Sequence, residues 1–406
     1  MHFGGFISSR TFFRSSRKFT LLILKISIIG TALSTFVMTL SLSLVNGFED
    51  EITKKIIGFQ GHIQVRNLDL NASREFTPFE RLKEFEQWLV EHPEIISVEP
   101  TIYKHGIAKS STSNEGLIFK GLSHLPKSSF FEENLLYGSF PKYSDTLDNY
   151  NCVLSKTSAN RLSLDTGDRL DVFFIHEGKV RQRKFLISGI YTTGFEERDQ
   201  NLALCDLRIL QRLYSGDFNL VGTYEIAVRD GANIEKVCQE VDDQLDHSKT
   251  AISIVESNAM LFQWLKIVHS NIFLILGLVL LVSTINMATT SLILILDRTM
   301  FIGILKTLGL GNYSLNTLFL RHGLALTSMG FGIGSLISLM VILIQKHYKL
   351  IPLDSKIYYM SYVPVKLDGF YFLEIFILLI ASSFLSLILP ARLISRIHPS
   401  KALRFS

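Results

Sequence analysis

Few side chains of this sequence stand at spacings that support catalysis. The run Gly332-Ile333-Gly334-Ser335 has the outline of a turn that presents a nucleophilic serine. It lies inside a long apolar stretch, however, where small residues four positions apart favour the close packing of two helices. We therefore interpret Gly330 and Gly334 as helix-packing residues, and we predict no catalytic residue in this chain.

Motifs for cofactors and metals are also missing from the sequence. No G-x-x-x-x-G-K-S/T loop is present to cradle the phosphates of ATP, so the chain should not hydrolyse ATP itself. No HExxH motif or close group of histidine and glutamate residues has the spacing of metal ligands. We therefore predict that this chain binds no cofactor and no metal ion.

The three cysteines, Cys152, Cys205 and Cys238, form neither a CxxC motif nor a cluster with histidine. An odd number of cysteines cannot pair completely, so buried free thiols are the interpretation that we favour. A disulfide between two of them in an oxidising compartment stays open.

Four long apolar stretches must position the functional residues of this chain. Of the 406 residues, 47% are hydrophobic and only 19% are charged. The stretches occupy residues 26–48, 267–296, 315–345 and 369–391. Each is long enough for a membrane-spanning helix, which needs about 20 residues. This distribution excludes a soluble enzyme, a collagen-like chain, a disordered chain and a disulfide scaffold.

One carboxylate, Glu374, lies within the fourth stretch. It falls in the first turns of that stretch, where a charge costs much less than it does at the centre of the bilayer. Ion-driven transporters usually need more spans and polar groups at mid-membrane. We therefore do not interpret Glu374 as an ion relay.

Lysine and arginine are enriched in three short segments that hold one acidic residue between them. These segments are residues 1–25, 297–314 and 392–406. The positive-inside rule places all three in the cytoplasm, so both termini are predicted to be cytoplasmic. Residues 49–266, where acidic side chains outnumber basic ones, and residues 346–368 then lie outside. The basic excess is a signal of membrane topology, and we predict no nucleic-acid partner.

Residues 49–266 have the pattern of a mixed α/β domain. Strands are predicted at residues 61–66, 95–103, 117–120, 170–175, 184–190 and 224–228, and helices at 78–90 and 232–245. Residues 137–150 are predicted to form a subdomain junction. The predicted fold class is therefore an α-helical membrane protein with four transmembrane helices and a large mixed α/β extracytoplasmic domain.

Both ends of this outer domain are predicted to grow from membrane helices. Apolar residues spaced by four continue from the first span through Phe48, Ile52 and Ile56, and Gly58 is predicted to end that helix. A matching stripe, from residue 261 to residue 272, enters the second span. The two stripes can pair as a stalk, or each can pack on the domain as a simple amphipathic face.

A short amphipathic helix is predicted between the second and third spans. Asp297 can cap its start, and Gly309 suits its end. Its apolar side chains Phe301 and Ile302, together with the basic Lys306, suit either the membrane surface or a groove on a partner protein.

The segment from Arg298 to Gly309 resembles the coupling helix of the FtsX/MacB-type permeases of ABC transporters. In that family the helix docks on a separate ATPase subunit, so the resemblance favours a partner groove over the membrane surface. It assigns ATPase coupling to Arg298, Thr299, Phe301, Ile302, Gly303, Leu305, Lys306 and Gly309. Exporter relatives commonly have glutamate where this chain has Phe301.

Within that superfamily the sequence resembles the lipoprotein-releasing permeases, LolC and LolE, over essentially its whole length. The passages that favour this branch are Asn46–Ile63 and Tyr358–Val365. Residues 162–172 and 189–199 resemble their outer domain, and residues 390–392 and 399–404 resemble the shared carboxy-terminal pattern. The resemblance implies an outer domain of MacB-like periplasmic core type.

The resemblance also implies a function, which is the extraction of lipoproteins from the bacterial inner membrane. The implied partners are a separate ABC ATPase subunit, a second permease that is identical or related, the lipoprotein substrate, membrane lipid and a periplasmic lipoprotein carrier. ATP would be used on the partner subunit. Motion would pass through residues 298–309 and the stalks.

Two other functions stay open. The first keeps the superfamily but makes the chain an FtsX-like regulator of a cell-wall hydrolase or a MacB-like exporter. The second is a membrane scaffold or sensor that does no transport and has no ATPase partner. The outer segment is larger than a typical FtsX-type domain, and MacB-like exporters often carry their ATPase on the same chain.

Overall fold

The structure is a computed structural model that describes residues 18–68, 75–123, 130–140, 150–214, 218–386, 388 and 390. The chain divides into two compact units. The helical unit takes the described residues of Met1–Glu49, Trp264–Ile351 and Val363–Ser406. The α/β unit takes those of Asp50–Gln263 and Pro352–Tyr362. The predicted cytoplasmic tail and most of the predicted N-terminal segment lie outside the described residues.

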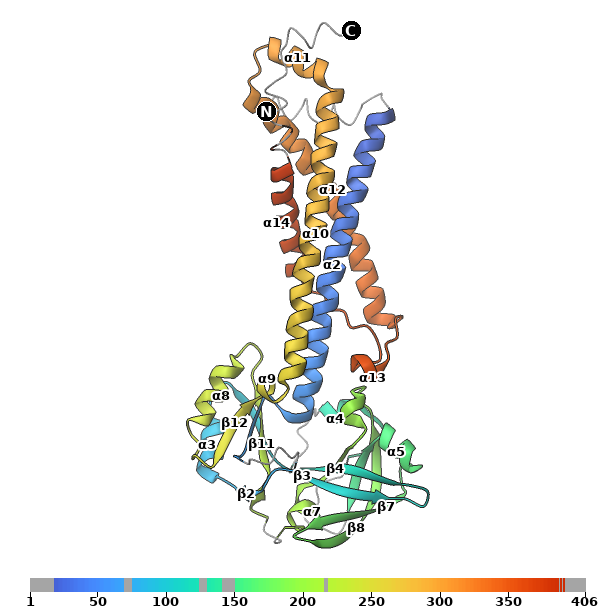
Figure 1. Ribbon diagram of the computed structural model, residues 1–406, viewed down its shortest axis with the longest axis vertical. Helices are drawn as coiled ribbons and strands as arrows, with labels where there is room; N and C mark the ends of the chain where they lie inside the picture. Colours follow the sequence, from blue (N-terminus) through green and yellow to red (C-terminus); the bar gives the residue numbers. More distant parts are fainter. Residues whose placement is uncertain are drawn as a thin grey trace. The chain divides into compact units, whose positions relative to one another are not determined.

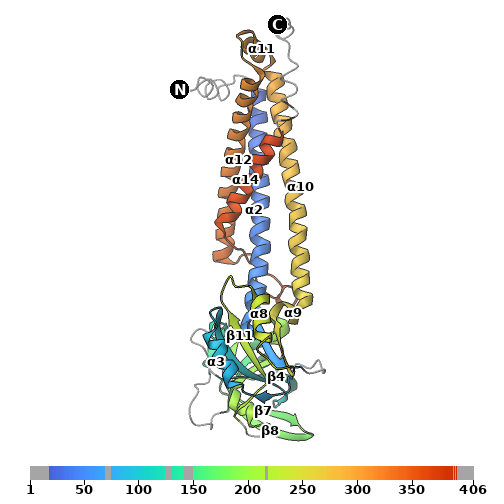
Figure 2. The ribbon, with the colours of Figure 1, turned by 90° about the vertical axis from the view of Figure 1, so that its left-hand side faces the viewer.

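Four long helices make up most of the helical unit. They are α2 (Lys18–Gln60), α10 (Ala259–Asp297), α12 (Asn312–Tyr348) and α14 (Gly369–Ser386). Each is long and apolar enough to cross a membrane. They run alongside one another in both views (Figures 1 and 2). The four predicted apolar helices are thus confirmed, although α2, α10 and α12 extend beyond the predicted bounds.

Apolar and hydroxyl side chains together pack these helices. One buried cluster joins α2, α10 and α14, and its members are Met38, Leu42, Ile272, Leu276, Ile375 and Leu379. Two hydroxyl pairs add contacts to α14: Thr284 with Ser382 at 2.7 Å, and Thr327 with Ser383 at 2.5 Å. Hydrogen bonds between small polar side chains are a normal means of helix association where no water competes.

Helix α2 is unbroken from the helical unit into the α/β unit and ends at Gln60, beyond the end predicted at Gly58. Gly58 is helical, and its missing side chain leaves room for Phe130, whose Cγ atom would lie 2.2 Å from a Cβ at that position. Gly61 follows the helix with a left-handed backbone (φ +71°) that favours glycine. The prediction was wrong because Gly58 serves close packing and Gly61 serves termination.

The α/β unit is built on a sheet that has ten strands within the described residues. The strands are β1 (Ile63–Asn67), β3 (Ile95–Lys109), β4 (Asn114–Leu122), β5 (Leu135–Gly138), β6 (Asn151–Ser155), β7 (Arg169–His176), β8 (Lys179–Tyr191), β9 (Leu202–Asp206), β11 (Thr223–Val228) and β12 (Lys249–Ser253). Strands β3, β4, β9, β6, β8 and β7 pair in a closed ring, because β7 joins β8 back to β3. A separate pair is formed by β2 (Phe79–Glu80) and β10 (Leu220–Val221).

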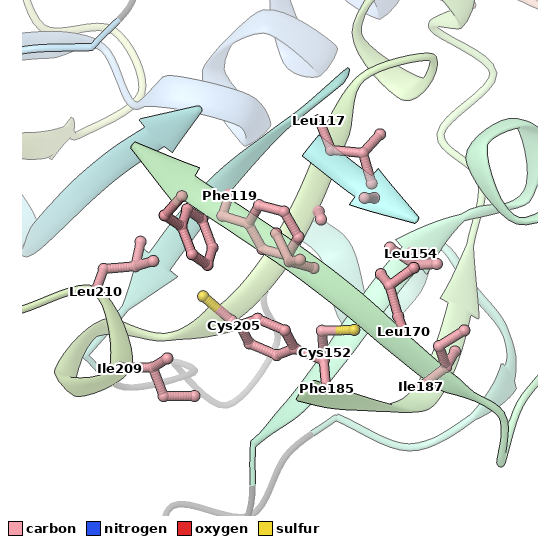
Figure 3. Packing of buried hydrophobic residues seen from close by; sticks show 14 of the residues in the cluster. Leu117, Phe119, Cys152, Leu154, Leu170, Phe185, Ile187, Cys205, Ile209 and Leu210 are labelled. Atoms are coloured by element: carbon pink, nitrogen blue, oxygen red, sulfur yellow. The ribbon is translucent and has the colours of Figure 1, made fainter. Parts of the chain in front are cut away.

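Two hydrophobic cores divide this unit into lobes. The ring lobe consists of the strands of the closed ring with α5 (Lys156–Leu162) and α7 (Leu207–Gln211), and its core includes Phe119 and Phe185 (Figure 3). The open lobe consists of β1, β11 and β12, covered by α3 (Lys83–Glu91) and α8 (Ile234–Asp242). Strand β3 runs through both lobes, since it pairs with β11 in its first half and with β4 in its second.

All three cysteines are buried and free, as the sequence interpretation favoured. Cys152 and Cys205 are directly opposite each other on the antiparallel strands β6 and β9, within the core of the ring lobe (Figure 3). Cys238 lies in the core of the open lobe.

The predicted strands of the outer domain are all present, although β3, β4 and β8 are much longer than expected. The helix predicted at 78–90 begins only at Lys83, because Phe79 and Glu80 pair with β10. Of the predicted junction 137–150, residues 141–149 lie outside the described residues. The strands that were not predicted are β2, β5, β6, β9, β10 and β12.

A segment between α12 and α14 completes the α/β unit. It holds the short helix α13 (Ser355–Tyr358). The Lys55 Nζ of α2 donates a hydrogen bond to the backbone carbonyl of Tyr359 at 3.0 Å. The rings of Tyr359 and Phe195 lie with their centroids 4.9 Å apart. This part of the predicted external loop 346–368 therefore packs against the end of α2.

Candidate functional site

The turn between α10 and α12 contains the short helix α11 (Thr299–Thr307), at the position where a coupling helix was predicted (Figure 1). Its start differs from the prediction. Helix α10 ends at Asp297, and Arg298 occupies the N-cap position of α11 without a capping side-chain hydrogen bond. Asp297 instead accepts a hydrogen bond from the Thr20 hydroxyl of α2 at 2.8 Å. Asp297 therefore joins two helices, and the prediction that it caps α11 was wrong.

The end of α11 agrees with the prediction. Gly309 has a left-handed backbone (φ +90°), which glycine adopts without strain. The Gly309 N–H donates to the carbonyl of Lys306 at 3.0 Å, and the Leu310 N–H donates to that of Leu305 at 3.0 Å. This pair of bonds is the Schellman pattern that closes many helices. Gly309 thus ends the helix and fixes where the chain turns into α12.

One face of α11 is buried against the helices that flank it. Ile302 has an exposed fraction of 0%, and Gly303 is also buried. The cluster around Ile302 consists of Leu294, Ile295, Leu315, Leu318 and Phe319, with Leu305 packed against it. Ile302 and Gly303 therefore pack α11 against the chain's own helices, whereas they were predicted to contact the ATPase directly.

The opposite face of α11 is apolar and exposed. Met300, Ile304 and Leu308 follow one another at intervals of four, and Leu308 has an exposed fraction of 78%. The predicted residues Arg298, Thr299, Phe301 and Lys306 are half-buried beside this stripe. A rigid helix with an exposed apolar stripe can dock in a groove of another protein. Met300, Ile304 and Leu308 were not among the predicted coupling residues, although their spacing of four marks one face of a helix.

Gly330 and Gly334 lie where α12 meets α2. A Cβ atom at Gly334 would lie 2.4 Å from the carbonyl oxygen of Ala32, and one at Gly330 would lie 2.6 Å from the Cβ of Thr31. A Cβ at Gly332 would face open space. The two crowded glycines therefore permit a backbone contact between the helices that a larger residue would prevent.

Two passages that carried the family resemblance meet within the helical unit. A Cβ atom at Gly47 of α2 would lie 2.8 Å from the carbonyl oxygen of Pro364. The Ser43 hydroxyl donates to the carbonyl of Lys366 at 2.8 Å, and the Lys366 N–H donates to the Ser43 carbonyl at 3.0 Å. The chain that leads into α14 is therefore fastened to α2, and Gly47 is the residue that lets it approach.

Glu374 is exposed on α14. Among the described residues, no group of three or more histidine, cysteine, aspartate or glutamate side chains is placed to hold a metal ion.

Two family models match this chain. Residues 26–244, more than half of the chain, match the MacB-like periplasmic core domain. Residues 273–399 match the FtsX-like permease C-terminal domain. The chain belongs to the MacB/FtsX permease family. Membership confirms the resemblance drawn from the segment of α11 and from the outer domain, and it confirms the predicted fold class.

Curated relatives match this MacB/FtsX permease along most of its length. The lipoprotein-releasing system transmembrane protein LolC of Xylella fastidiosa (strain Temecula1) is 22% identical over 395 residues, which covers 93% of each chain. LolC of Neisseria meningitidis serogroup B is 22% identical and covers 94% of this chain and 93% of its own. Among solved structures, the periplasmic region of MacB from Actinobacillus actinomycetemcomitans covers 51% of this chain and 97% of its own, at 15% identity and a TM-score of 0.36.

Proposed function

We propose that this permease is the transmembrane subunit of an ABC transporter that extracts lipoproteins from the inner membrane and passes them to a periplasmic carrier. Similarity to LolC proteins over nearly the whole chain supports the substrate class. The observation that carries the mechanism is the exposed stripe of α11, held rigid by the buried Ile302. An ATPase seated on that stripe would move α10 and α12 together, because α11 joins them.

The energetics of extraction require an external source of work. Each CH₂ group that leaves the bilayer costs about 0.8 kcal/mol, so a lipoprotein anchored by two or three acyl chains does not leave spontaneously at a useful rate. The sequence holds no phosphate-binding loop of its own. ATP would therefore be hydrolysed on a separate subunit, and this chain would convert the motion of that subunit into lipoprotein release.

The proposed arrangement in the membrane follows from the charge pattern. Both termini and α11 would lie in the cytoplasm, and the α/β unit would lie in the periplasm. A second permease, identical or related, would complete the complex. Lipoprotein would enter from the outer leaflet between α2 and α10, and closure of the ATPase subunits would squeeze that space.

The experiment that tests the function is purification of the tagged protein in mild detergent, followed by mass spectrometry of what accompanies it. A P-loop ATPase together with acylated lipoproteins is the expected result. An ATPase with a cell-wall hydrolase would favour the FtsX-like alternative. Absence of any ATPase under several gentle conditions would contradict transport and favour the scaffold or sensor.

Replacement of Ile304 by glutamate sharpens this test, because it charges the exposed stripe and leaves the buried Ile302 in place. We expect Ile304→Glu to reduce the recovered ATPase at least fivefold while the permease remains in the membrane fraction. Val90→Glu, at an exposed apolar position on α3 of the α/β unit, is the matched control. Equal ATPase recovery with Ile304→Glu and Val90→Glu would show that the stripe is not the docking surface.

A further inference from the structure

The end of α2 is held by a buried lysine of the sheet. Lys120 of β4 has an exposed fraction of only 2%, and its Nζ donates to the backbone carbonyl of Phe59, near the last turn of α2, at 2.6 Å. The last carbonyls of a helix lack partners within the helix and carry the negative end of its dipole. The buried Lys120 ammonium group provides a donor for one of these carbonyls and a positive charge at the negative end of the dipole.

The same ammonium group links the two lobes of the α/β unit. Lys120 belongs to the ring lobe, and its Nζ also donates to the Glu225 carboxylate of β11, in the open lobe, at 2.7 Å. The other carboxylate oxygen of Glu225 accepts from the hydroxyl of Tyr103 at 2.5 Å. Tyr103 stands directly opposite Lys120 on β3, the strand that runs through both lobes. Burial raises the pKa of the Tyr103 hydroxyl well above its ordinary value, so that hydroxyl remains a donor.

Aromatic side chains fix the position of this helix end. The Phe59 ring meets Phe130, Phe131 and Phe195 edge to face, with centroid distances of 5.4, 5.5 and 5.9 Å. The Phe130 ring also occupies the space left by the missing side chain of Gly58. Displacement of α2 would therefore displace the Phe59 carbonyl and the aromatic cluster together.

We propose that Lys120, with Glu225 and Tyr103, is the junction that couples the two lobes of the α/β unit at the end of α2, so that both follow the movement of α2 together. The proposal rests on the function proposed above. Lys120 is a positioning residue: it touches no substrate, and it joins the helix that leaves the membrane to β4 and β11. With the junction intact, displacement of α2 turns the two lobes as a pair. Without it, the aromatic contacts still hold the helix end to the ring lobe, and Gly61 and His62 still lead from α2 into β1 of the open lobe. The buried ion pair between β4 and β11, however, no longer couples the two lobes to each other beside the helix end.

The test removes both charges at once, since loss of one partner would leave the other buried and unpaired. The variant Lys120→Met/Glu225→Gln keeps the side-chain shapes and the neutral balance. Lys104→Met/Glu75→Gln is the matched control, because Lys104 is also buried and paired with a glutamate. Lys104 adjoins Tyr103 in β3 and so points to the other face of the strand.

The measurement is lipoprotein released per ATP hydrolysed. Complexes purified with their ATPase are reconstituted in vesicles of phosphatidylethanolamine and phosphatidylglycerol that hold a fluorescent triacylated lipoprotein, and a periplasmic extract supplies the carrier. We expect the Lys120/Glu225 variant to keep its ATPase rate within about twofold and to lose at least tenfold in released lipoprotein per ATP. The Lys104/Glu75 variant should lose less than twofold.

Other outcomes overturn the inference. An unchanged ratio in the Lys120/Glu225 variant does so, as does an equal loss in both variants, which would show a general effect of removing a buried ion pair. If the double variant fails to fold, Tyr103→Phe takes its place. An unchanged amount of lipoprotein released per ATP in that variant would likewise contradict the inference. A wild-type complex that hydrolyses ATP but releases no lipoprotein overturns the proposed function, and the inference falls with it.

Discussion

Asp199, the last residue of the short helix α6 (Glu196–Asp199), is a carboxylate that the fold buries almost completely. It accepts hydrogen bonds from the Thr193 N–H at 2.9 Å, the Thr193 hydroxyl at 2.8 Å and the Gly194 N–H at 3.2 Å. Burial nevertheless outweighs these bonds and raises the pKa of Asp199 to about 6. The folded protein therefore holds this proton at a pH where the unfolded chain has released it.

The sign of the pH dependence follows from linkage. Because the folded pKa lies above the unfolded value of 3.8, the contribution of Asp199 to stability falls as the pH rises from about 4 to about 6 and is constant above that. The whole change is about 3 kcal/mol, at about 1.4 kcal/mol for each pKa unit. Asp199→Asn does not titrate, so its unfolding free energy minus that of the wild type should rise over this interval.

Thermal unfolding of the full chain in detergent at pH 4.5, 5.5, 6.5 and 7.5 measures this difference. Asp246→Asn is the matched control, because Asp246 is exposed and its hydrogen bonds with Lys249 and Ser248 lower its pKa to about 2, below the range tested. A difference for Asp199→Asn that is flat across the series would contradict the raised pKa.

Single residues also show where sequence reasoning stops. Lys120 lies in a strand that was predicted correctly, but its burial depends on α2 and on β11, which are distant in the sequence. Nothing in the local pattern separates it from an exposed lysine. Ile302 is a similar case, since an apolar residue on an amphipathic helix suits either a partner or the chain's own helices.

At the scale of elements, an alternating apolar pattern in the sequence predicts strands that bury only one face. Buried residues alternate with more exposed ones in β7 and over residues 181–189 of β8, and both strands were predicted. All residues of β9 are buried, and so are four of the five in β6. Strands covered on both faces show no alternation, and runs this short cannot be told from a buried helix segment. The four long helices were predicted because length and apolar content alone decide them.

The contact between α2 and α12 carries a prediction about helix packing. At Gly334 a Cβ atom would lie 2.4 Å from a backbone oxygen of α2, so Gly334→Val must force the helices apart. We expect a loss of about 1–3 kcal/mol in stability, the usual result of overpacking. The measurement is the thermal midpoint of the detergent-solubilised protein. Gly332→Val, in open space on the same helix, should change that midpoint little. Equal midpoints for the two variants would refute the packing role.

At the scale of the whole molecule, α2 and α10 each belong to both units without a break. A continuous helix transmits displacement along its axis, whereas a flexible linker does not. Insertion of Gly-Ser-Gly-Ser between Glu49 and Asp50 should therefore leave both units folded and ATP hydrolysis intact. It should reduce lipoprotein release per ATP at least tenfold in the reconstituted assay.

The same insertion after Gly231, in an exposed turn before α8, is the control. It lengthens the chain equally but interrupts no helix. Retention of wild-type release by the Glu49–Asp50 insertion would mean that α2 need not be rigid for transport.

The segment Pro352–Tyr362 has a consequence for biosynthesis. It belongs to the α/β unit, yet it follows α10 and α12 in the chain. Chains are synthesised from the amino terminus, so the contacts of Tyr359 with Lys55 and Phe195 form only after both helices have been translated. The α/β unit therefore lacks the contacts of this segment until α12 has been synthesised and inserted in the membrane. Complete folding of the α/β unit therefore depends on membrane insertion of α10 and α12.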